Sequence, residues 1–236
     1  MRACWISAGV SSFIAGYLTD DVDEYLYIDI ADQHPDSMRF IRDCEDALGK
    51  RIIVLRSRVY RSVDDVIAAR RYVNGPAGAP CTVVLKKQVR RDWELAHYGD
   101  NITYVWGFDC TETNRANRVE ESLPSFNHEF PLIDRCLNKS DAHGILRELG
   151  IKRPAMYDLG YQNNNCIGCV KGGMGYWNKI RVDFPDVFEL RKTREREIGH
   201  SCIKGVFLDE LDPNRGRIGD EIMEECSLLC QLNIKE

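Results

Sequence analysis

The chain of 236 residues lacks the features of membrane proteins and of disulfide-stabilised secreted domains. Its longest apolar runs, such as residues 52–55, are far shorter than the roughly 20 residues that a membrane-spanning helix needs. The sequence does not open with an apolar leader and a basic flank, and ten cysteines are too few for a disulfide scaffold. We therefore expect a cytoplasmic protein with reduced thiols and no membrane partner.

Several common catalytic signatures are also missing. The sequence contains neither GxxxxGK[ST] nor GxGxxG, and its five histidines show no paired spacing such as HExxH. The net charge of −5 does not indicate general affinity for nucleic acids, although it does not exclude a local basic patch. No internal repeat or low-complexity linker interrupts the chain.

Short apolar runs alternate with longer amphipathic segments along the first 133 residues. This alternation predicts the α/β class, with an open, mainly parallel sheet in a three-layer α/β/α arrangement. From residue 150 the sequence becomes loop-like, so we expect a core over residues 1–150 and a cysteine-bearing C-terminal appendage over residues 151–236. The predicted strands are 2–7, 25–30, 51–55, 102–106 and 129–133, and the predicted helices are 11–18, 35–48, 63–71 and 82–97.

The segment "SAGVSS", residues 7–12, follows the first predicted strand and leads into the first predicted helix. In an open parallel sheet, ligands bind at the carboxyl ends of the strands. A glycine there lets the backbone approach a ligand, and serine hydroxyls add to the exposed amides at the helix start. The segment therefore predicts an anion site, and an ordinary serine cap is the alternative. The candidate residues are Ser7, Ala8, Gly9, Val10, Ser11 and Ser12.

Several segments, collinear along residues 2–200, share motifs with one family. "SAGVSS" is similar to a pyrophosphate loop that usually reads SGGxDS, and "GAPCTVVLKKQVR" is similar to a CTxxLK segment. "YIDIADQHPDSMRFI" and "VWGFDCTETNRANR" match a second and a fourth strand, and "FPLIDRCLNKSDAHGILRELGI" and "YDLGYQNNNCIGC" match a late helix and a cysteine loop. Together they resemble the phosphoadenosine phosphosulfate (PAPS) reductase-like branch of the adenine nucleotide alpha hydrolase and ATP pyrophosphatase superfamily. The resemblance implies an adenine nucleotide ligand, either PAPS or ATP.

The resemblance assigns roles to residues at the strand ends. It implies that amides of residues 7–12 bind the charged part of the nucleotide. Asp29 would hold a ribose or a metal ion, or merely cap a turn, and Gly107 and Asp109 would line the nucleotide. ATP-cleaving members have an aspartate that helps to hold the metal ion and phosphates where this chain has Ser11. The difference favours a sulfonucleotide over ATP with magnesium.

Basic residues near the substrate are expected at two of four candidate positions. Lys86 lies in the CTxxLK match, and Arg115 lies in the segment after the fourth strand. For Arg90 and Arg118 we expect solvated positions on helix faces.

Four cysteines form two closely spaced pairs. Cys166 and Cys169 form CxxC, and Cys226 and Cys230 form CxxxC. Four thiolates suit a [4Fe-4S] cluster or a structural zinc ion, and the resemblance favours the cluster. Reduced, semi-buried thiols that bind no metal are the alternative. The cysteines that could replace one of the four are Cys81 and Cys202.

Cys226 has a second expected role. PAPS reductases end in an ECGLH-like tail with a nucleophilic cysteine, and "EECSLLC" matches its Glu225 and Cys226 but not its glycine and histidine. A thiolate there would attack the sulfonate sulfur and release adenosine bisphosphate, and a thiol reductant such as thioredoxin would then release sulfite. Because a metal-bound Cys226 cannot attack, the two roles exclude one another in any one state.

Three functions therefore remain open. Sulfonucleotide reduction is preferred, with Cys226 and Lys86 as the expected catalytic residues and a homodimer possible. The first alternative is an ATP-dependent sulfurtransferase or adenylating enzyme with an iron–sulfur cluster, and the second is a non-catalytic nucleotide-binding protein. Tyr176 and Trp177 are expected to form an aromatic lid over the appendage, with base stacking as the alternative.

Overall fold

The chain divides into two compact units in a computed structural model that describes residues 1–75, 78–97, 99 and 101–221. The first unit comprises residues 1–29, 35–55 and 91–160, and the second comprises residues 30–34, 56–90 and 161 onward. This division differs from the predicted boundary at residue 150. The reason is that residues 30–34 and 56–90, which follow the second and third strands, group with the C-terminal part of the chain.

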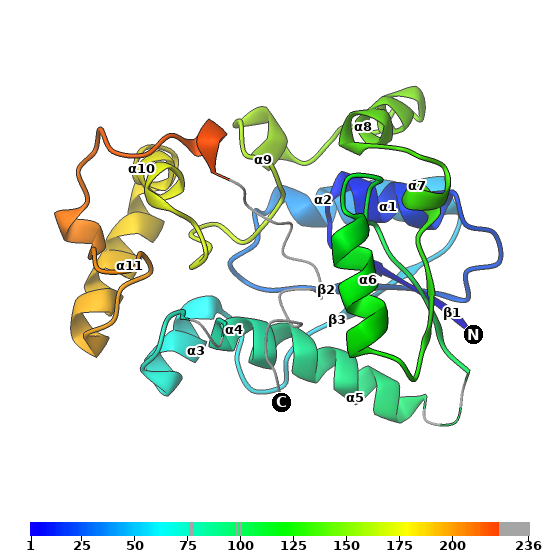
Figure 1. The fold of residues 1–236 in the computed structure, drawn as a ribbon, viewed down its shortest axis with the longest axis horizontal. Coiled ribbons are helices and arrows are strands. Elements are labelled where there is room, and N and C mark those ends of the chain that lie inside the picture. The colour runs from blue at the N-terminus through cyan, green and yellow to red at the C-terminus, as the bar shows by residue number, and fades with distance from the viewer. Residues whose placement is uncertain (76–77, 98, 100, 222–236) are drawn as a thin grey trace. The chain divides into compact units, whose positions relative to one another are not determined.

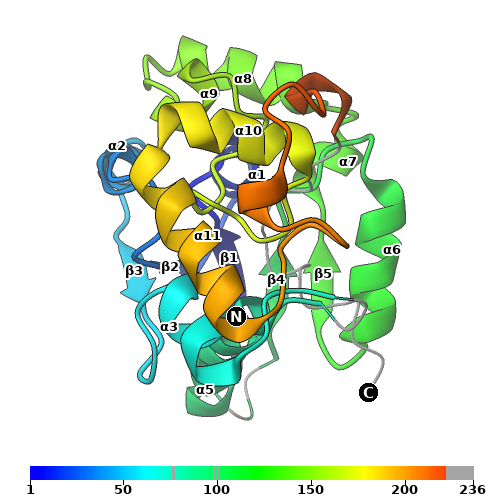
Figure 2. The ribbon, with the colours of Figure 1, turned by 90° about the vertical axis from the view of Figure 1, so that its left-hand side faces the viewer.

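The first unit contains a five-stranded parallel sheet with the order β3-β2-β1-β4-β5 (Figure 2). All four strand pairings are parallel, and Cys4 in the central strand lies opposite Tyr25 on one side and Val105 on the other. The predicted α/β class with a parallel sheet is confirmed. The strands are β1 (Arg2–Ile6), β2 (Glu24–Ile28), β3 (Ile52–Leu55), β4 (Thr103–Val105) and β5 (Asn127–Glu129).

Helices cover both faces of this sheet because neighbouring side chains of β1 point to opposite faces. The helices of this part of the chain are α1 (Val10–Tyr17), α2 (Asp36–Leu48), α5 (Gln88–Ala96), α6 (Thr113–Ser122), α7 (Pro131–Asp134), α8 (Lys139–Glu148) and α9 (Ala155–Asp158). Cys4 is buried in one cluster with Phe13 of α1, whereas the ring of Trp5 lies 5.6 Å from the ring of Trp93 in α5. Figure 1 shows α1 and α2 on one side of the sheet and α5 on the other.

Two local predictions need correction. The predicted strand at 129–133 is wrong, because the strand ends at Glu129 and Pro131 begins helix α7. Proline has no N–H for a sheet, and its fixed φ suits the first turn of a helix. The predicted helix at 82–97 contains a π-helical turn, η1 (Val83–Lys87), in which the Gln88 amide donates to the Val83 carbonyl.

The second unit is mainly helical. It contains α3 (Val63–Arg70), α4 (Pro80–Thr82), η1, α10 (Met174–Asp183), α11 (Pro185–Ile198) and the 3-10 turns η2 (Leu208–Glu210) and η3 (Ile218–Asp220). Helix α11 joins α3 through Asp64, which pairs with the guanidinium of Arg194 at 2.8 and 3.1 Å. Arg191, only 1% exposed, places its own guanidinium 3.6 Å from the same carboxylate. A partly buried charge cluster, with Arg191 fully buried, therefore ties these helices together.

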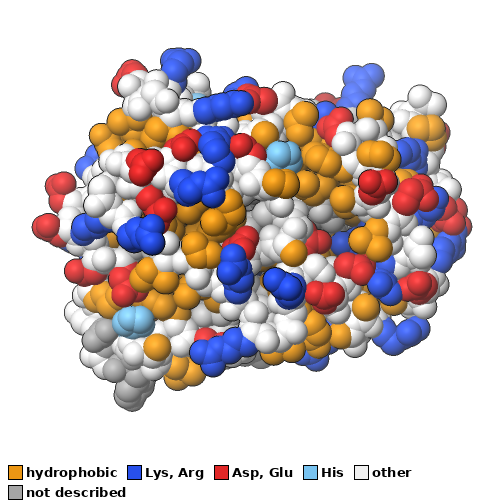
Figure 3. Space-filling model, turned by 180° about the vertical axis from the view of Figure 1, so that it is seen from behind, with side chains coloured by type: hydrophobic (Ala, Val, Ile, Leu, Met, Phe, Trp, Pro, Cys, Tyr) orange, Lys and Arg blue, Asp and Glu red, His pale blue; other side chains and the backbone are white. Residues whose placement is uncertain are grey.

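The surface gives little indication of a general partner. On the face drawn in Figure 3, basic and acidic side chains are intermixed, in agreement with the small net charge. Within residues 1–221, apart from the few that the structure does not describe, no helix has both the length and the apolar character needed to cross a membrane.

Candidate functional site

The predicted anion loop lies where the strand order reverses. From β1 the chain passes through α1 to β2 on one side, whereas β4 lies on the other side of β1 (Figure 2). In open α/β sheets, this reversal leaves a crevice at the carboxyl ends of the two strands, and ligands bind there. Residues 7–12 follow β1 and residue 107 follows β4 closely. Two predicted parts of the site therefore meet at the position that the topology favours.

The backbone of this loop is closely packed. A Cβ atom on Gly107 would lie 2.4 Å from the Cα atom of Ser12 and 2.6 Å from its nitrogen, so only glycine fits there. Ala8 has a φ angle of +59°, in the left-handed region that favours glycine. The related loop pattern has glycine at this position. Strained backbone of this kind concentrates at functional sites, because the surrounding packing must hold it in place.

The loop is also closed by its own hydroxyl groups. The Ser12 hydroxyl donates to the Gly9 carbonyl at 2.9 Å, accepts from the Ser7 amide at 3.0 Å and lies 2.9 Å from the Ser7 hydroxyl. The Gly9 amide donates to the Ser7 hydroxyl at 3.2 Å, and the Val10 amide donates to the Tyr157 hydroxyl at 3.4 Å. Two of the amides expected to bind an anion thus have side-chain acceptors, at distances longer than the usual 2.9–3.0 Å.

Tyr157 is a site residue that the sequence did not reveal. Its ring lies 4.8 Å from the ring of His143, and the ammonium group of Lys139 lies 5.7 Å from its centre. Burial, with contributions in the same direction from the positive charges of Lys139 and Arg153, lowers the pKa of His143 to about 4. Arg153 pairs with Asp158 at 2.7 Å, whereas the ammonium group of Lys139 lies against the ring of Tyr157.

Of three other predicted residues, Asp29 follows β2 and Asp109 follows β4, whereas Arg115 lies in the first turn of α6. The Asp29 amide extends the strand pairing by donating to the Leu55 carbonyl at 2.9 Å. The Asp109 carboxylate accepts from the amide and hydroxyl of Thr111, at 2.8 and 2.6 Å. Asp109 therefore shapes its own turn, in addition to any contact with a ligand. Arg115 is buried, pairs with Glu112 and lies over the ring of Phe108, 5.2 Å from its centre.

The other basic candidates have mixed outcomes. Lys86 lies within the π-helical turn of the second unit, a conformation that is frequent at functional sites. Arg118 is exposed and donates to the Asn114 carbonyl, as predicted for a solvated helix face. The same prediction is wrong for Arg90, which is only 3% exposed. Its position after the buried Val89 shows that both residues lie on the covered side of the helix.

The CxxC loop is held firmly within the second unit. The Tyr176 hydroxyl accepts from the Cys169 amide at 2.9 Å and donates to the Cys166 carbonyl at 3.2 Å. The Ile167 amide donates to the Asp32 carbonyl at 2.8 Å, and both cysteines are buried. Tyr176 therefore braces the loop from inside. The rings of Tyr176 and Trp177 are both buried, so they pack inside the second unit, and neither ring is accessible for base stacking in this structure.

The thiol groups of this loop are donors that suit a soft metal ion. Cys166 and Cys169 supply two thiols at the CxxC spacing that iron–sulfur and zinc sites use. Among the described residues, no group of three or more His, Cys, Asp and Glu side chains is placed to hold a metal ion. The other two predicted ligands, Cys226 and Cys230, lie outside the described residues. Of the two cysteines that could replace a ligand, Cys81 is partly buried and Cys202 is buried.

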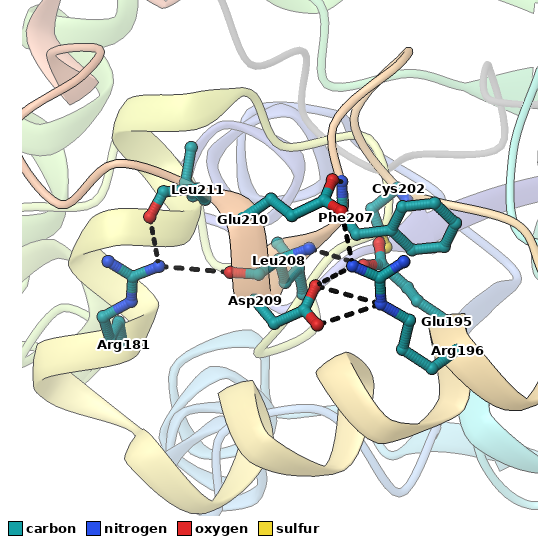
Figure 4. Close-up of polar contacts among 9 residues, drawn as sticks. All are labelled: Arg181, Glu195, Arg196, Cys202, Phe207, Leu208, Asp209, Glu210 and Leu211. Atoms are coloured by element: carbon teal, nitrogen blue, oxygen red, sulfur yellow. Dashed lines mark hydrogen bonds and ion pairs between the residues drawn. The ribbon is translucent and has the colours of Figure 1, made fainter.

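Cys202 belongs to a buried network around Glu195. The Glu195 carboxylate accepts from the amides of Cys202 and Leu208, the latter at 2.8 Å (Figure 4). Burial raises the pKa of Glu195, although these amides and Arg191 act in the opposite direction. Burial also raises the pKa of the Cys202 thiol, and that of Cys4 to about 12. Neither thiol is suited to act as a thiolate nucleophile.

A separate cavity lies at the other end of the strands, the end at which β4 and β5 begin. Its volume is about 450 Å³, and its walls include Leu95, Ile102 and Phe126. Ile102 and Phe126 immediately precede β4 and β5, so this cavity lies at the amino ends of the strands. It is therefore distinct from the position of residues 7–12, which follow the carboxyl end of β1.

Only part of the predicted site is thus brought together. Residues 7–12 and Gly107 are in contact, Asp29, Asp109 and Arg115 belong to the same unit, and Lys86 and the CxxC pair belong to the other. The family resemblance rests on sequence motifs, since no family model matches the chain and no curated protein matches its sequence.

Proposed function

We propose that the first unit binds an adenine nucleotide by its anionic end and that the protein reduces a sulfonucleotide. The observation that carries this proposal is the contact between Gly107 and Ser12, which joins the two strand ends at the reversal of strand order. A glycine-dependent backbone contact beside a helix start is an arrangement that suits a phosphate group. The positive charge of Lys139 beside the ring of Tyr157 supports the same choice of ligand.

Binding at this loop requires an exchange of hydrogen bonds. The Gly9 and Val10 amides would turn from the hydroxyls of Ser7 and Tyr157 to phosphate oxygens. A charged acceptor forms shorter bonds, about twice as strong as neutral ones, so the exchange favours the nucleotide. The released hydroxyls can then donate to the same anion.

The proposed reaction has two steps. A thiolate, expected at Cys226, attacks the sulfonate sulfur, and the sulfur–oxygen bond breaks with its electron pair leaving on adenosine bisphosphate. A second thiol then attacks the cysteine sulfur, which releases sulfite and forms a disulfide, and a dithiol such as thioredoxin reduces that disulfide. Cys226 lies outside the described residues, so its role stays a prediction. The role of Lys86, which is to neutralise the negative charge of the substrate, also stays a prediction.

The braced CxxC loop favours one alternative, an ATP-dependent sulfurtransferase or adenylating enzyme with an iron–sulfur cluster. In that case Cys166 and Cys169 would hold the cluster together with the second cysteine pair, and the cluster would supply redox or sulfur chemistry. The first turn of α1 offers Ser11 where ATP-cleaving relatives have a carboxylate, which makes it a poorer magnesium ligand. This feature is why sulfonucleotide reduction remains the preferred reaction.

One incubation experiment separates these reactions. Purified protein is mixed with PAPS and reduced thioredoxin, or with ATP and magnesium, and the nucleotides are separated by chromatography while sulfite is measured. We expect adenosine bisphosphate and sulfite in equal amounts from PAPS, and no AMP from ATP. AMP and pyrophosphate from ATP would establish the alternative, and binding without turnover of either nucleotide would identify a non-catalytic nucleotide-binding protein.

A further inference from the structure

The chain that leads into helix α9 is anchored to helix α2 by the guanidinium group of one arginine. Arg39 of α2 donates to the carbonyls of Lys152 and Arg153, at 2.6 and 3.1 Å. Its other N–H groups donate to the carboxylate of Asp36, at 2.7 and 2.9 Å, and to that of Asp43 at 2.6 Å. A guanidinium group has five N–H donors in a rigid fork, and here each of them has an acceptor. Arg39 therefore fixes the path of this segment relative to α2.

The carboxylate of Asp36 fixes the start of α9 in the same way. It accepts from the amide of Ala155, the first residue of α9, at 2.8 Å while it also binds Arg39. This amide is at a helix start, where the backbone offers no acceptor and a negative charge is favourable. A helix of a single turn has little stability of its own, because nucleation costs more than one turn returns. The position of α9 therefore depends on Asp36 and Arg39, here called the clamp.

Helix α9 carries the tyrosine that contacts the predicted anion loop. The amide of Tyr157 donates to the Pro154 carbonyl at 3.1 Å, so its backbone follows the clamped segment. Its ring is buried with its centre 4.8 Å from that of His143 in α8, and α8 packs against α1. Its hydroxyl accepts from the amide of Val10, the first residue of α1, at 3.4 Å. All these residues belong to the first unit, so the clamp connects to the loop within one compact body.

The hydroxyl of Tyr157 can serve a bound anion better than it serves the loop itself. Its bond from the Val10 amide, at 3.4 Å, is longer than the usual 2.9–3.0 Å and joins two neutral groups. A phosphate oxygen that takes over this amide would be a charged acceptor, and the phenol could donate to the same phosphate. Bonds to charged acceptors are about twice as strong as neutral ones. Binding would therefore replace a weak bond of the phenol by a stronger one.

We propose that the clamp positions Tyr157 so that its hydroxyl donates to the phosphate held by residues 7–12. Tyr157 is then a ligand-binding residue, and Arg39 is a positioning residue that acts through it. The inference deepens the proposed function and rests on it, because it names side chains that hold the anionic end of the nucleotide. The ligand group that it requires is a phosphate or pyrophosphate.

The test pairs each variant with the same substitution elsewhere on a neighbouring element. Tyr157→Phe removes the hydroxyl at the start of α1, whereas the control Tyr25→Phe removes one that donates to the Gly16 carbonyl near the end of α1, at 3.2 Å. Arg39→Lys keeps the charge and loses the fork, and the control Arg42→Lys changes an exposed position of α2. The double variant Tyr157→Phe/Arg39→Lys completes a cycle. Calorimetry gives the Kd of adenosine bisphosphate and of pyrophosphate, urea unfolding confirms that each variant is folded, and the Val10 amide resonance is recorded without ligand.

Tyr157→Phe should raise both Kd values about tenfold, because the lost bond to a charged acceptor outweighs the neutral bond that the Val10 amide no longer makes. Arg39→Lys should raise them at least about threefold, since an ammonium group replaces only part of the fork. The double variant should bind no more weakly than Tyr157→Phe, and both controls should match the wild type. Arg39→Lys should also shift the Val10 resonance in the wild type but not in Tyr157→Phe.

Equal pyrophosphate Kd values for Tyr157→Phe and Tyr25→Phe would overturn the inference while leaving the proposed function standing. Additive effects of Arg39→Lys and Tyr157→Phe, or a Val10 resonance that Arg39→Lys does not shift, would equally show that Arg39 does not act through the phenol. If the wild type binds pyrophosphate but no adenine nucleotide, the proposed function fails and the pyrophosphate values still decide the role of the clamp. A wild type that binds neither ligand contradicts both.

Discussion

Replacing Gly107 by alanine is expected to weaken nucleotide binding by at least about tenfold. The new Cβ would meet the Ser12 Cα atom at 2.4 Å and its nitrogen at 2.6 Å, and neither backbone atom can move without displacing the start of α1. Overpacking of this kind costs about 1–3 kcal/mol, which the first unit would lose in its free energy of unfolding. Because the displaced residues carry the proposed phosphate contacts, we expect the Kd of adenosine bisphosphate to rise by at least about tenfold, the equivalent of 1.4 kcal/mol.

Gly144→Ala is the matched control in the same unit. Gly144 lies inside helix α8, and a Cβ there would meet no atom within 4 Å. Alanine in a helix interior is more stable than glycine by roughly 0.5–1 kcal/mol, so this variant should be slightly stabilised and bind as the wild type does. Calorimetric titration and urea unfolding measure both effects. Normal binding by Gly107→Ala would show that the crevice between β1 and β4 does not hold the nucleotide.

A second large effect is expected when Glu195 becomes alanine. The side chain is fully buried, and its two oxygens accept the amides of Cys202 and Leu208 (Figure 4). Truncation leaves both amides without these acceptors and removes a negative charge beside the buried guanidinium of Arg191. We expect the free energy of unfolding of the second unit to fall by about 3–5 kcal/mol, the usual cost of breaking a buried charge network.

Glu189→Ala on the same helix provides the comparison. Glu189 is mainly exposed and pairs with Lys192 one turn away, and such surface pairs contribute about 0.5 kcal/mol or less. Hydrogen exchange of the amides in α10 and α11 reports the stability of this unit separately from the sheet. Equal exchange rates in Glu195→Ala and Glu189→Ala would contradict the structural role assigned to the buried carboxylate.

Local sequence signals predicted strands β1 to β4 well because these strands are short and mainly apolar, whereas β5 has the polar sequence Asn-His-Glu. The predicted strand at 2–7 differs from β1 by one residue at its end, and the predicted helix at 11–18 differs from α1 by one residue at each end. Gly49 ends α2 with a φ angle of +61°, as its glycine suggested. The error at 129–133 came from reading an apolar run through Pro131, which only a helix start accommodates.

Contacts between distant residues could not be predicted in the same way. Tyr157 reaches the Val10 amide across 147 positions of sequence, and nothing in its local pattern marks it as part of the loop. The sequence predicted that Gly107 lines the nucleotide. Its contact with Ser12 could not be predicted, because that contact depends on β4 lying next to β1 in the sheet. The burial of Arg90 likewise depends on tertiary packing that a helical period alone does not specify.

The contact of residues 208–221 with helix α10 illustrates a signal that was present but not specific. In "KGGMG", Gly172 and Gly173 precede α10 and Gly175 lies in its first turn, whereas the sequence alone predicted only a loop there. Glycines at a helix start also permit close backbone approach, as Gly175 does with Ile218. The sequence contains no indication that the approaching segment is residues 208–221, because the acceptor Glu221 lies 46 positions after Gly175.

The central claim is that backbone amides at the start of α1 bind the anionic end of an adenine nucleotide. The most direct measurement is an amide chemical-shift titration of isotope-labelled protein with adenosine bisphosphate. We predict saturable shifts concentrated at the amides of Gly9, Val10, Ser11 and Ser12, with Gly107 next and Gly144 unchanged. Saturable shifts elsewhere with these amides unmoved, or no shifts at any concentration up to the millimolar range, would contradict it.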